Sequence, residues 1–307
     1  MRVNFFRALQ DLAKERKNII LLTGDLGFKL FDSFRSQYPD RFYNVGVAES
    51  NMIGIAAGLS LSGKNVYCYS IIPFLIMRTF EHIRIDLAYN NLKVKLVGAG
   101  GGFTYGLEGY THFGLEDLAL MRSLPNMTVV VPADPQEAIS LAKASVEYDG
   151  PIYIRLGKTG EPFIHEKPIE FRIGRSIILS EGKDIAIFAI GSMVYPLIAT
   201  VELLKKAGFN ATLINMHTLK PLDKAIIEQV SSSHSFIFTV EEHYVNGGLG
   251  SAVAEVLAES GFNGSFRRIG IPNDLGKYIG KSDYLKGKYG LTTEGVYKKI
   301  IECVEEV

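Results

Sequence analysis

Glu49 is the residue of this chain whose surroundings are most typical of a proton-transfer group. It comes directly after a short apolar segment, Phe42–Val47, which predicts a β-strand, and before residues 50–61, whose small side chains predict a closely packed helix. Ligand sites of parallel α/β sheets form at the ends of such strands. An apolar setting around one carboxyl group suits proton chemistry, although a solvated glutamate before a helix has the same pattern.

A second candidate is the glycine-rich segment 98–114, which follows the apolar run Lys93–Val97. Glycine-rich loops at strand ends let a ligand approach the backbone closely. His112 in this loop could transfer a proton or donate a hydrogen bond, or it could be a polar residue before a helix. Phe103 stands where G-x-G-x-x-G requires glycine, and no G-x-x-x-x-G-K-[ST] run occurs, so neither nucleotide fingerprint is supported.

Three further segments carry groups with more than one interpretation. Asp25 follows the apolar run Ile19–Thr23 and is either a site residue or a helix cap. The charged segment Arg78–Asp86 is either solvated or lies at a subunit contact. Residues 241–243, Glu-Glu-His, invite a catalytic role, but the glycines at 247–250 favour caps, turns and a helix that begins at glycine.

These candidates depend on elements that alternate along the chain. Apolar runs of strand length alternate with amphipathic helical segments, which predicts parallel sheets covered by helices on both faces. The segment from Gly157 to Arg175 interrupts this alternation with glycine, proline and charge. We therefore expect two doubly wound α/β domains, at residues 1–160 and 178–307, with a linker at 161–177 and the second domain smaller.

Composition narrows the function classes. The 307 residues contain 33 Lys and Arg against 33 Asp and Glu, so no basic surface for nucleic acid or an acidic membrane is expected, and assembly is weakly favoured. The two cysteines, Cys68 and Cys303, have no metal-ligand spacing, which fits a reducing cytoplasm. No apolar run approaches the length that spans a membrane.

Taken together, the motifs resemble the C-terminal half of transketolase, from Thr23 to about Ser251. The resemblance implies a pyrimidine-binding domain, a transketolase C-terminal domain and the cofactor thiamine diphosphate. Its most specific stretches are Gly46–Met52, Tyr110–His112, Met121–Met127, Val131–Asp134, Lys220–Asp223 and Glu241–Gly250.

The resemblance also implies roles for individual residues. Glu49 would share a proton with N1′ of the aminopyrimidine, which favours the imino form that removes the thiazolium C2 proton. Asp25 would lie beside the thiazolium ring. The segment that holds the pyrimidine would contribute Phe74, Met77 and Phe80.

On the substrate side, His112 matches the histidine that bonds the hydroxyl groups of the donor sugar. Glu108 replaces an aspartate that reads an acceptor hydroxyl, and Gly100 replaces a phosphate-binding histidine, so phosphate recognition is expected to differ. Arg78 resembles the substrate arginine of deoxyxylulose phosphate synthase. The implied substrate-binding residues are thus Thr23, Arg78, Glu108, His112 and Lys158.

The chain lacks the Gly-Asp-Gly run with which this family binds diphosphate and Mg²⁺. The resemblance therefore implies a partner, an N-terminal transketolase subunit carrying that domain, in an α2β2 assembly that transfers two-carbon ketol units between sugars or sugar phosphates. Two alternatives stay open. One is a 2-oxo acid dehydrogenase β subunit or a relative of deoxyxylulose phosphate synthase, and the other is a non-catalytic scaffold subunit.

Overall fold

The computed structural model describes residues 1–158, 160–273 and 278–306, and it divides the chain into two compact units. The first unit contains residues 1–101 and 120–173, and the second contains residues 102–119 and those from 174 onward. Both units are α/β, which confirms the predicted fold class. Residues 102–119 pack as part of the second unit, although they lie within the sequence range expected for the first domain.

In the first unit, six parallel strands pair in the order β5-β6-β4-β3-β1-β2. The residues of β1 and β6 are all buried, as expected for strands with helices on both faces. The strands are β1 (Ile19–Thr23), β2 (Phe42–Asn44), β3 (Asn65–Ile71), β4 (Val94–Ala99), β5 (Thr128–Val130) and β6 (Ile152–Leu156).

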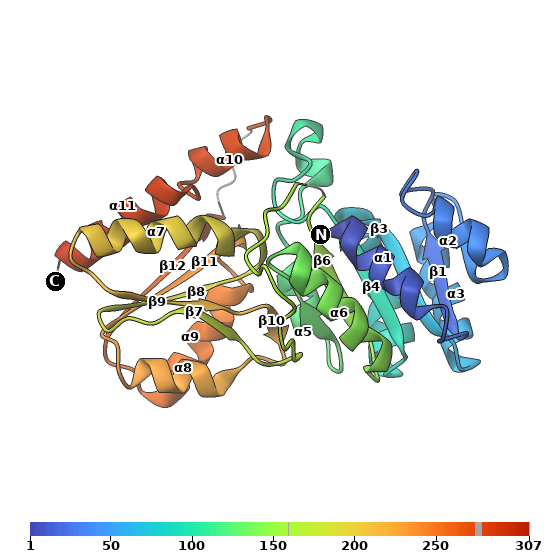
Figure 1. The fold of residues 1–307 in the computed structure, drawn as a ribbon, viewed down its shortest axis with the longest axis horizontal. Helices are drawn as coiled ribbons and strands as arrows, with labels where there is room; N and C mark the ends of the chain where they lie inside the picture. Colours follow the sequence, from blue (N-terminus) through green and yellow to red (C-terminus); the bar gives the residue numbers. More distant parts are fainter. Residues whose placement is uncertain (159, 274–277, 307) are drawn as a thin grey trace. The chain divides into compact units, whose positions relative to one another are not determined.

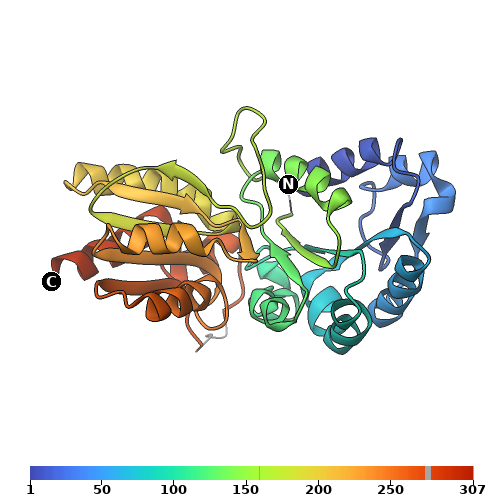
Figure 2. The ribbon, with the colours of Figure 1, turned by 90° about the horizontal axis from the view of Figure 1, so that it is seen from below.

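Helices cover both faces of this sheet (Figures 1 and 2). One face packs against α1 and α6, whose apolar side chains share a core with alternate residues of the strands. The other face carries α3 and the helical segment that follows β3. The helices are α1 (Arg2–Leu12), α2 (Asp32–Gln37), α3 (Glu49–Leu61), α4 (Phe80–His82) and α6 (Pro135–Glu147), while α5 (Asp117–Ser123) begins in the loop assigned to the second unit.

The register of this sheet determines which residues meet at the carboxyl ends of β1, β2 and β3. Thr23, the last residue of β1, pairs with Asn44 of β2 on one side and with Tyr69 of β3 on the other. All three strands are parallel, so their carboxyl ends lie at one edge. The residues that follow, from Gly24, from Val45 and at Ser70, are therefore neighbours at that edge although they are distant in sequence.

The second unit holds a five-stranded sheet in the order β12-β11-β8-β9-β7. Its pairs are parallel except for β7, which runs antiparallel to β9 at the edge and was not predicted because its residues are half-exposed. Figure 1 shows α7 and α11 on one face and α8 and α9 on the other. The elements are β7 (Ile177–Ser180), β8 (Ile185–Ala189), β9 (Ala211–Asn215), β10 (Thr218–Lys220), β11 (Phe236–Tyr244), β12 (Ser265–Ile271), α7 (Val194–Lys206), α8 (Lys224–Ser231), α9 (Leu249–Ser260), α10 (Ser282–Lys288) and α11 (Thr293–Glu305).

The lengths of the helices can be compared with the length needed to span a membrane. The helices α3, α6, α7 and α11 have 13 residues each, short of the length that crosses a bilayer. In the part of the chain that the structure describes, no helix is both long and apolar enough to be a membrane span.

Lys95 is an unusual residue of the first sheet because its side chain is fully buried within β4. Its ammonium group donates a hydrogen bond to the carbonyl of Tyr148, with 3.0 Å between Nζ and O. Burial, and to a lesser extent the positive charge of Lys93, lowers the pKa of Lys95 to about 7, and the carboxylate of Asp149 opposes this shift. A buried amine of this kind disfavours the charged form.

This shift predicts a pH-dependent stability. In the unfolded chain Lys95 keeps its proton up to its ordinary pKa of 10.5, whereas in the folded protein it loses the proton near pH 7. The unfolded state then binds more protons between these values, so the free energy of unfolding rises with pH by up to about 1.4 kcal/mol per pH unit. We expect Lys95→Met, which carries no proton, to be more stable than the wild type at pH 7, with the difference shrinking towards pH 10. Urea unfolding of both proteins at several pH values measures it.

The control is Lys93→Met, which removes only the smaller cause of the shift in the pKa of Lys95 and should keep most of the rise of stability with pH. A stability difference between the wild type and Lys95→Met that is the same at every pH would contradict the prediction.

Candidate active site at Glu49

Glu49 is the first residue of α3 and is 1% exposed, so its carboxylate is buried where β2 gives way to the helix. Ser70 donates a hydrogen bond to one carboxylate oxygen, with Oγ 3.1 Å from Oε1. Arg78 donates to the other, with Nη1 2.8 Å from Oε2. A negative charge in the first turn also lies favourably in the field of the helix. The carboxylate is thus buried and held from both sides, although β2 ends at Asn44 and not at Val47, the predicted end of the strand.

Space remains beside this carboxylate because residue 24 is glycine. A Cβ placed on Gly24 would lie 3.4 Å from Glu49 Oε1 and 3.5 Å from Ser70 Oγ. A side chain longer than alanine would therefore cover the Oε1 side of Glu49. Nothing in the sequence pattern marked Ser70 or Gly24 as site residues, since only the strand order makes them neighbours of Glu49.

An irregular helical segment follows β3, and Arg78 comes directly after its first turn. Two π-helical turns, Pro73–Met77 and Ile83–Tyr89, flank the short α4 helix, and such turns are frequent at functional sites. The guanidinium carbon of Arg78 lies 4.7 Å from the ring centroid of Phe74, and its side chain is 47% exposed. Met77 and Phe80 of the same segment are half-buried. Arg78 thus reaches Glu49 from a partly solvated position.

Asp25 is held next to the same sheet edge by Asn44. The amide nitrogen of Asn44 donates to Asp25 Oδ1 at 2.8 Å, and the backbone N–H of Asp25 donates to Asn44 Oδ1 at 3.0 Å. Asp25 has a positive φ of 58°, a conformation that aspartate tolerates better than most residues. The buried hydroxyl of Thr23 donates to the carbonyl of Leu26 at 2.9 Å, so it supports this turn.

The remaining predicted residues are distributed over both units. Lys158 is exposed and lies in the first unit, two residues after the end of β6. Glu108 and His112 belong to the loop that packs with the second unit, where Glu108 is exposed and His112 half-buried. The ring nitrogen Nδ1 of His112 lies 2.9 Å from the hydroxyl of Thr111. The structure therefore groups Asp25, Glu49, Phe74 and Arg78 in one unit and the two loop residues in the other.

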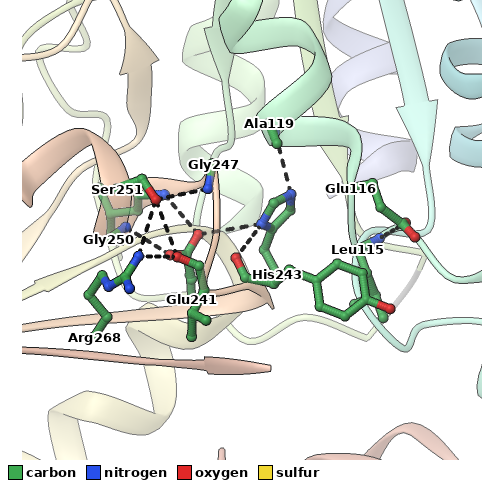
Figure 3. A network of polar contacts seen from close by, with 12 residues as sticks. Leu115, Glu116, Ala119, Glu241, His243, Gly247, Gly250, Ser251 and Arg268 are labelled. Carbon is green, nitrogen blue, oxygen red and sulfur yellow. Dashed lines mark hydrogen bonds and ion pairs between the residues drawn. The ribbon is translucent and has the colours of Figure 1, made fainter. Parts of the chain in front are cut away.

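The Glu-Glu-His segment at the end of β11 contains buried polar groups that bond to backbone groups (Figure 3). The buried carboxylate of Glu241 accepts hydrogen bonds from the backbone N–H groups of Leu249 and Gly250, at 2.8 Å each. These donors begin α9, so the interpretation of this segment as a helix cap is confirmed. His243 Nδ1 lies 2.7 Å from the carbonyl of Tyr244, to which it donates, and Nε2 accepts from Ala119 N–H at 3.4 Å.

One cluster that the sequence did not suggest, Asp134, Glu137 and His165, brings a ligand atom from each residue within 4.8 Å of the others. Asp134 already caps α6, because its carboxylate accepts from Glu137 N–H at 2.7 Å and from the N–H groups of Ile164 and His165 at 2.8 Å. Burial would raise the pKa of Asp134, but the hydrogen bonds from His165 and these N–H groups outweigh it and lower that pKa. The bond to Asp134 raises the pKa of His165. We interpret the cluster as an ion pair that fastens residues 164–165 to α6.

Comparisons with known proteins agree with this architecture. Residues 1–160 match the family model of the transketolase pyrimidine binding domain, and residues 174–296 match that of the transketolase C-terminal domain. The chain is 41% identical to a putative transketolase C-terminal section of Methanocaldococcus jannaschii, over 98% of this chain and 95% of the relative. It is 36% identical to one subunit of an apulose-4-phosphate transketolase of Phocaeicola vulgatus, over 99% of this chain and 97% of the relative.

A solved structure described as a split gene transketolase, inactive beta4 tetramer, superimposes with a TM-score of 0.89 at 37% identity, covering 98% of this chain and 97% of that one. The chain therefore belongs to the transketolase family. It corresponds to the C-terminal subunit of transketolases that are divided between two chains, which confirms the resemblance.

The residues around Glu49 fit one end of the family's cofactor. A buried carboxylate needs a donor on each oxygen, and the donor on Oε2 is a half-exposed arginine that a ring nitrogen could replace. The aromatic ring of Phe74 and the thioether of Met77 lie on the adjoining segment, and both side chains pack well on a flat heterocycle. For the diphosphate and Mg²⁺ the sequence offers no Gly-Asp-Gly motif.

The pairing of Arg78 with Glu49 yields a stability prediction. Removing the guanidinium leaves the buried carboxylate of Glu49 with one of its two donors missing. Arg78→Met should therefore lower the free energy of unfolding by about 1–2 kcal/mol. The loss stays below that of a fully buried pair because Arg78 is partly exposed. In a Glu49→Gln background the same change should cost clearly less. Chemical unfolding of the four proteins of this double-mutant cycle measures the coupling.

Arg84→Met is the matched control, because Arg84 is about as exposed as Arg78 but its partner Glu81 is exposed, whereas Glu49 is buried. It should change stability little. Equal losses from Arg78→Met in both backgrounds would show that the pair with Glu49 contributes nothing.

Proposed function

We propose that this chain is the C-terminal subunit of a thiamine-diphosphate-dependent transketolase that moves a two-carbon ketol unit from a ketose to an aldose. The observation that carries the proposal is the buried carboxylate of Glu49 at the carboxyl edge of the first sheet. Family membership over nearly the whole chain supports the reaction class. When bound, thiamine diphosphate supplies the carbanion that carries the ketol unit.

In this proposal Glu49 would hold the aminopyrimidine of thiamine diphosphate by sharing a proton with a ring nitrogen. Arg78 would give up its place at Oε2 to the ring nitrogen, which its half-exposed position allows. Ser70 stays on Oε1 and keeps the carboxylate oriented. The surrounding burial excludes water, which strengthens the hydrogen bond of Glu49 to the ring.

The other residues would act on the rest of the cofactor and on the sugar. Phe74, Met77 and Phe80 would pack on the pyrimidine, and Asp25, fixed by Asn44, would face the thiazolium ring. His112 and Glu108 would bond hydroxyl groups of the sugars, and Lys158 and Arg78 would bind an anionic substituent. Thr23 would support the turn that carries Asp25.

The proposal includes a partner subunit that binds the diphosphate and Mg²⁺, in an α2β2 enzyme. The missing Gly-Asp-Gly run supports it. So does the description of a structurally similar split transketolase chain as an inactive β4 tetramer, which indicates that a chain of this kind can assemble without being active. Because one relative is a subunit of an apulose-4-phosphate transketolase, apulose 4-phosphate belongs among the substrates to be tested.

Reconstitution tests this function. The chain without a partner should show no ketol transfer, and addition of the N-terminal subunit with thiamine diphosphate and Mg²⁺ should produce it from a panel of ketose donors and aldose acceptors. Ketol transfer by the isolated chain would refute the need for a partner. A reconstituted complex that decarboxylates pyruvate and transfers no ketol unit would favour the dehydrogenase or deoxyxylulose phosphate synthase alternative.

Glu49→Gln isolates the proposed catalytic role. The amide cannot share a proton with the ring nitrogen, so we expect ketol transfer in the reconstituted complex to fall by about 100-fold or more, while assembly with the partner persists. Glu81→Gln, an exposed glutamate of the neighbouring segment, is the control and should keep full activity. Full activity of Glu49→Gln would exclude Glu49 as the proton-sharing group and would favour a scaffold role or another proton route.

A further inference from the structure

The loop from Gly102 to Ala119, which carries Glu108 and His112, is closed at its base. Gly102 and Gly114 exchange two backbone hydrogen bonds, of 2.8 and 3.1 Å, and the ring centroids of the adjoining Phe103 and Phe113 lie 5.1 Å apart with their planes nearly perpendicular. The chain between these residues is therefore a compact loop whose ends are fixed to each other. Its orientation depends on what holds the base.

The carboxylate of Glu242, 2% exposed, holds this base. Oε1 accepts a hydrogen bond from Phe103 N–H at 2.8 Å. Oε2 accepts from the hydroxyl of Ser192 at 2.6 Å and lies 3.2 Å from Nζ of Lys286. A carboxylate bonded by a backbone N–H, a hydroxyl and an ammonium group is fixed in one orientation, so it fixes the backbone that it accepts from.

The close approach of Glu242 explains the glycine at residue 102. Gly102 has a φ of 62°, and a Cβ on it would lie 2.3 Å from Cδ of Glu242. Glycine is needed here both for the backbone conformation and for room. The contact between loop and carboxylate is thus built into the glycine-rich sequence.

The next two residues of β11 hold the other end of the loop (Figure 3). His243 accepts from Ala119 N–H at 3.4 Å, and Tyr244 N–H donates to the carbonyl of Leu115 at 3.1 Å. Within the loop, Gly106 accepts from Gly280 N–H at 3.2 Å, and the ring of Phe103 stacks on Tyr289 at 5.5 Å. The loop is therefore held at both ends by the β11 terminus, and the part near its beginning also contacts the segment around α10.

We propose that the carboxyl end of β11 positions the loop that binds the sugar, with Glu242 as a positioning residue for His112. This inference rests on the proposed function for its catalytic meaning. None of the predicted site residues lies in the second domain, residues 178–307. In this inference that domain still serves the site, because it holds the loop that carries Glu108 and His112. Glu242 acts through the backbone of Phe103 and needs no contact with substrate.

Hydrogen exchange of the full-length chain tests the positioning step without any activity. Glu242→Leu removes the acceptor of Phe103 N–H, so exchange of the amides in residues 103–119 should speed up by about 10-fold or more. Glu242→Gln keeps an amide oxygen for Phe103 N–H and should show a smaller increase, which guards against a Leu variant that fails to fold. Unchanged exchange of this loop in both variants would overturn the inference.

Kinetics of the reconstituted complex then separate positioning from general destabilisation. If Glu242 positions a residue that binds sugar, its variants should raise KM for the ketose by about 5-fold or more with a smaller change in kcat and unchanged affinity for thiamine diphosphate. Glu241→Gln is the control, because the carboxylate of Glu241 accepts from the first N–H groups of α9 and not from the loop. It should lower stability and leave KM unchanged.

Equal KM effects from the Glu241 and Glu242 variants would overturn the positioning role. A wild-type complex that transfers no ketol unit would instead refute the proposed function, and the exchange experiment would still decide whether Glu242 holds the loop.

Discussion

The burial of the Glu49 carboxylate is the constraint on which the first unit's site depends. A carboxylate removed from water is tolerated when its oxygens are bonded by fixed donors. Ser70 at the end of β3 and Arg78 on the irregular segment after it provide these bonds. Both donors reach Glu49 because β1, β2 and β3 are parallel neighbours whose ends share one edge. Helix α3 carries Glu49, and the sheet register and the π-helical turns place the two donors that bond its carboxylate.

The second unit uses the same principle with backbone donors. Successive side chains of a strand point in opposite directions, and the two buried glutamates at the end of β11 have separate partners accordingly. Glu241 accepts from the first N–H groups of α9, and Glu242 accepts from Phe103 in the loop. A helix start and a loop base are therefore fixed from adjacent residues. These separate donors explain how two adjacent acidic residues can both be buried.

Much of the fold was predictable because its signals are local. Five-residue runs such as Ile19–Thr23 and Ile152–Leu156 are mostly apolar, as is typical of buried parallel strands, and they match β1 and β6, whose residues are all buried. The helix predicted at Pro135–Glu147 matches α6, with proline in its first turn and Asp134 as its cap. The edge strand β7 was missed because half-exposed residues next to a polar segment give no such signal. The packing of residues 102–119 with the second unit gives no local signal either, because these contacts come from residues more than a hundred positions away.

The sequence by itself determined the α/β class, the likeness to the C-terminal half of transketolase and the place of Glu49 between an apolar segment and a helix of small residues. It did so because periodicity and motifs are properties of neighbouring residues. Only the tertiary structure decided that Ser70 and Arg78 bond Glu49, that Asn44 holds Asp25, and that Glu242 holds the loop of His112. These pairings follow from strand order and from the need of each buried carboxylate for donors, and residues distant in sequence meet those needs once the chain has folded.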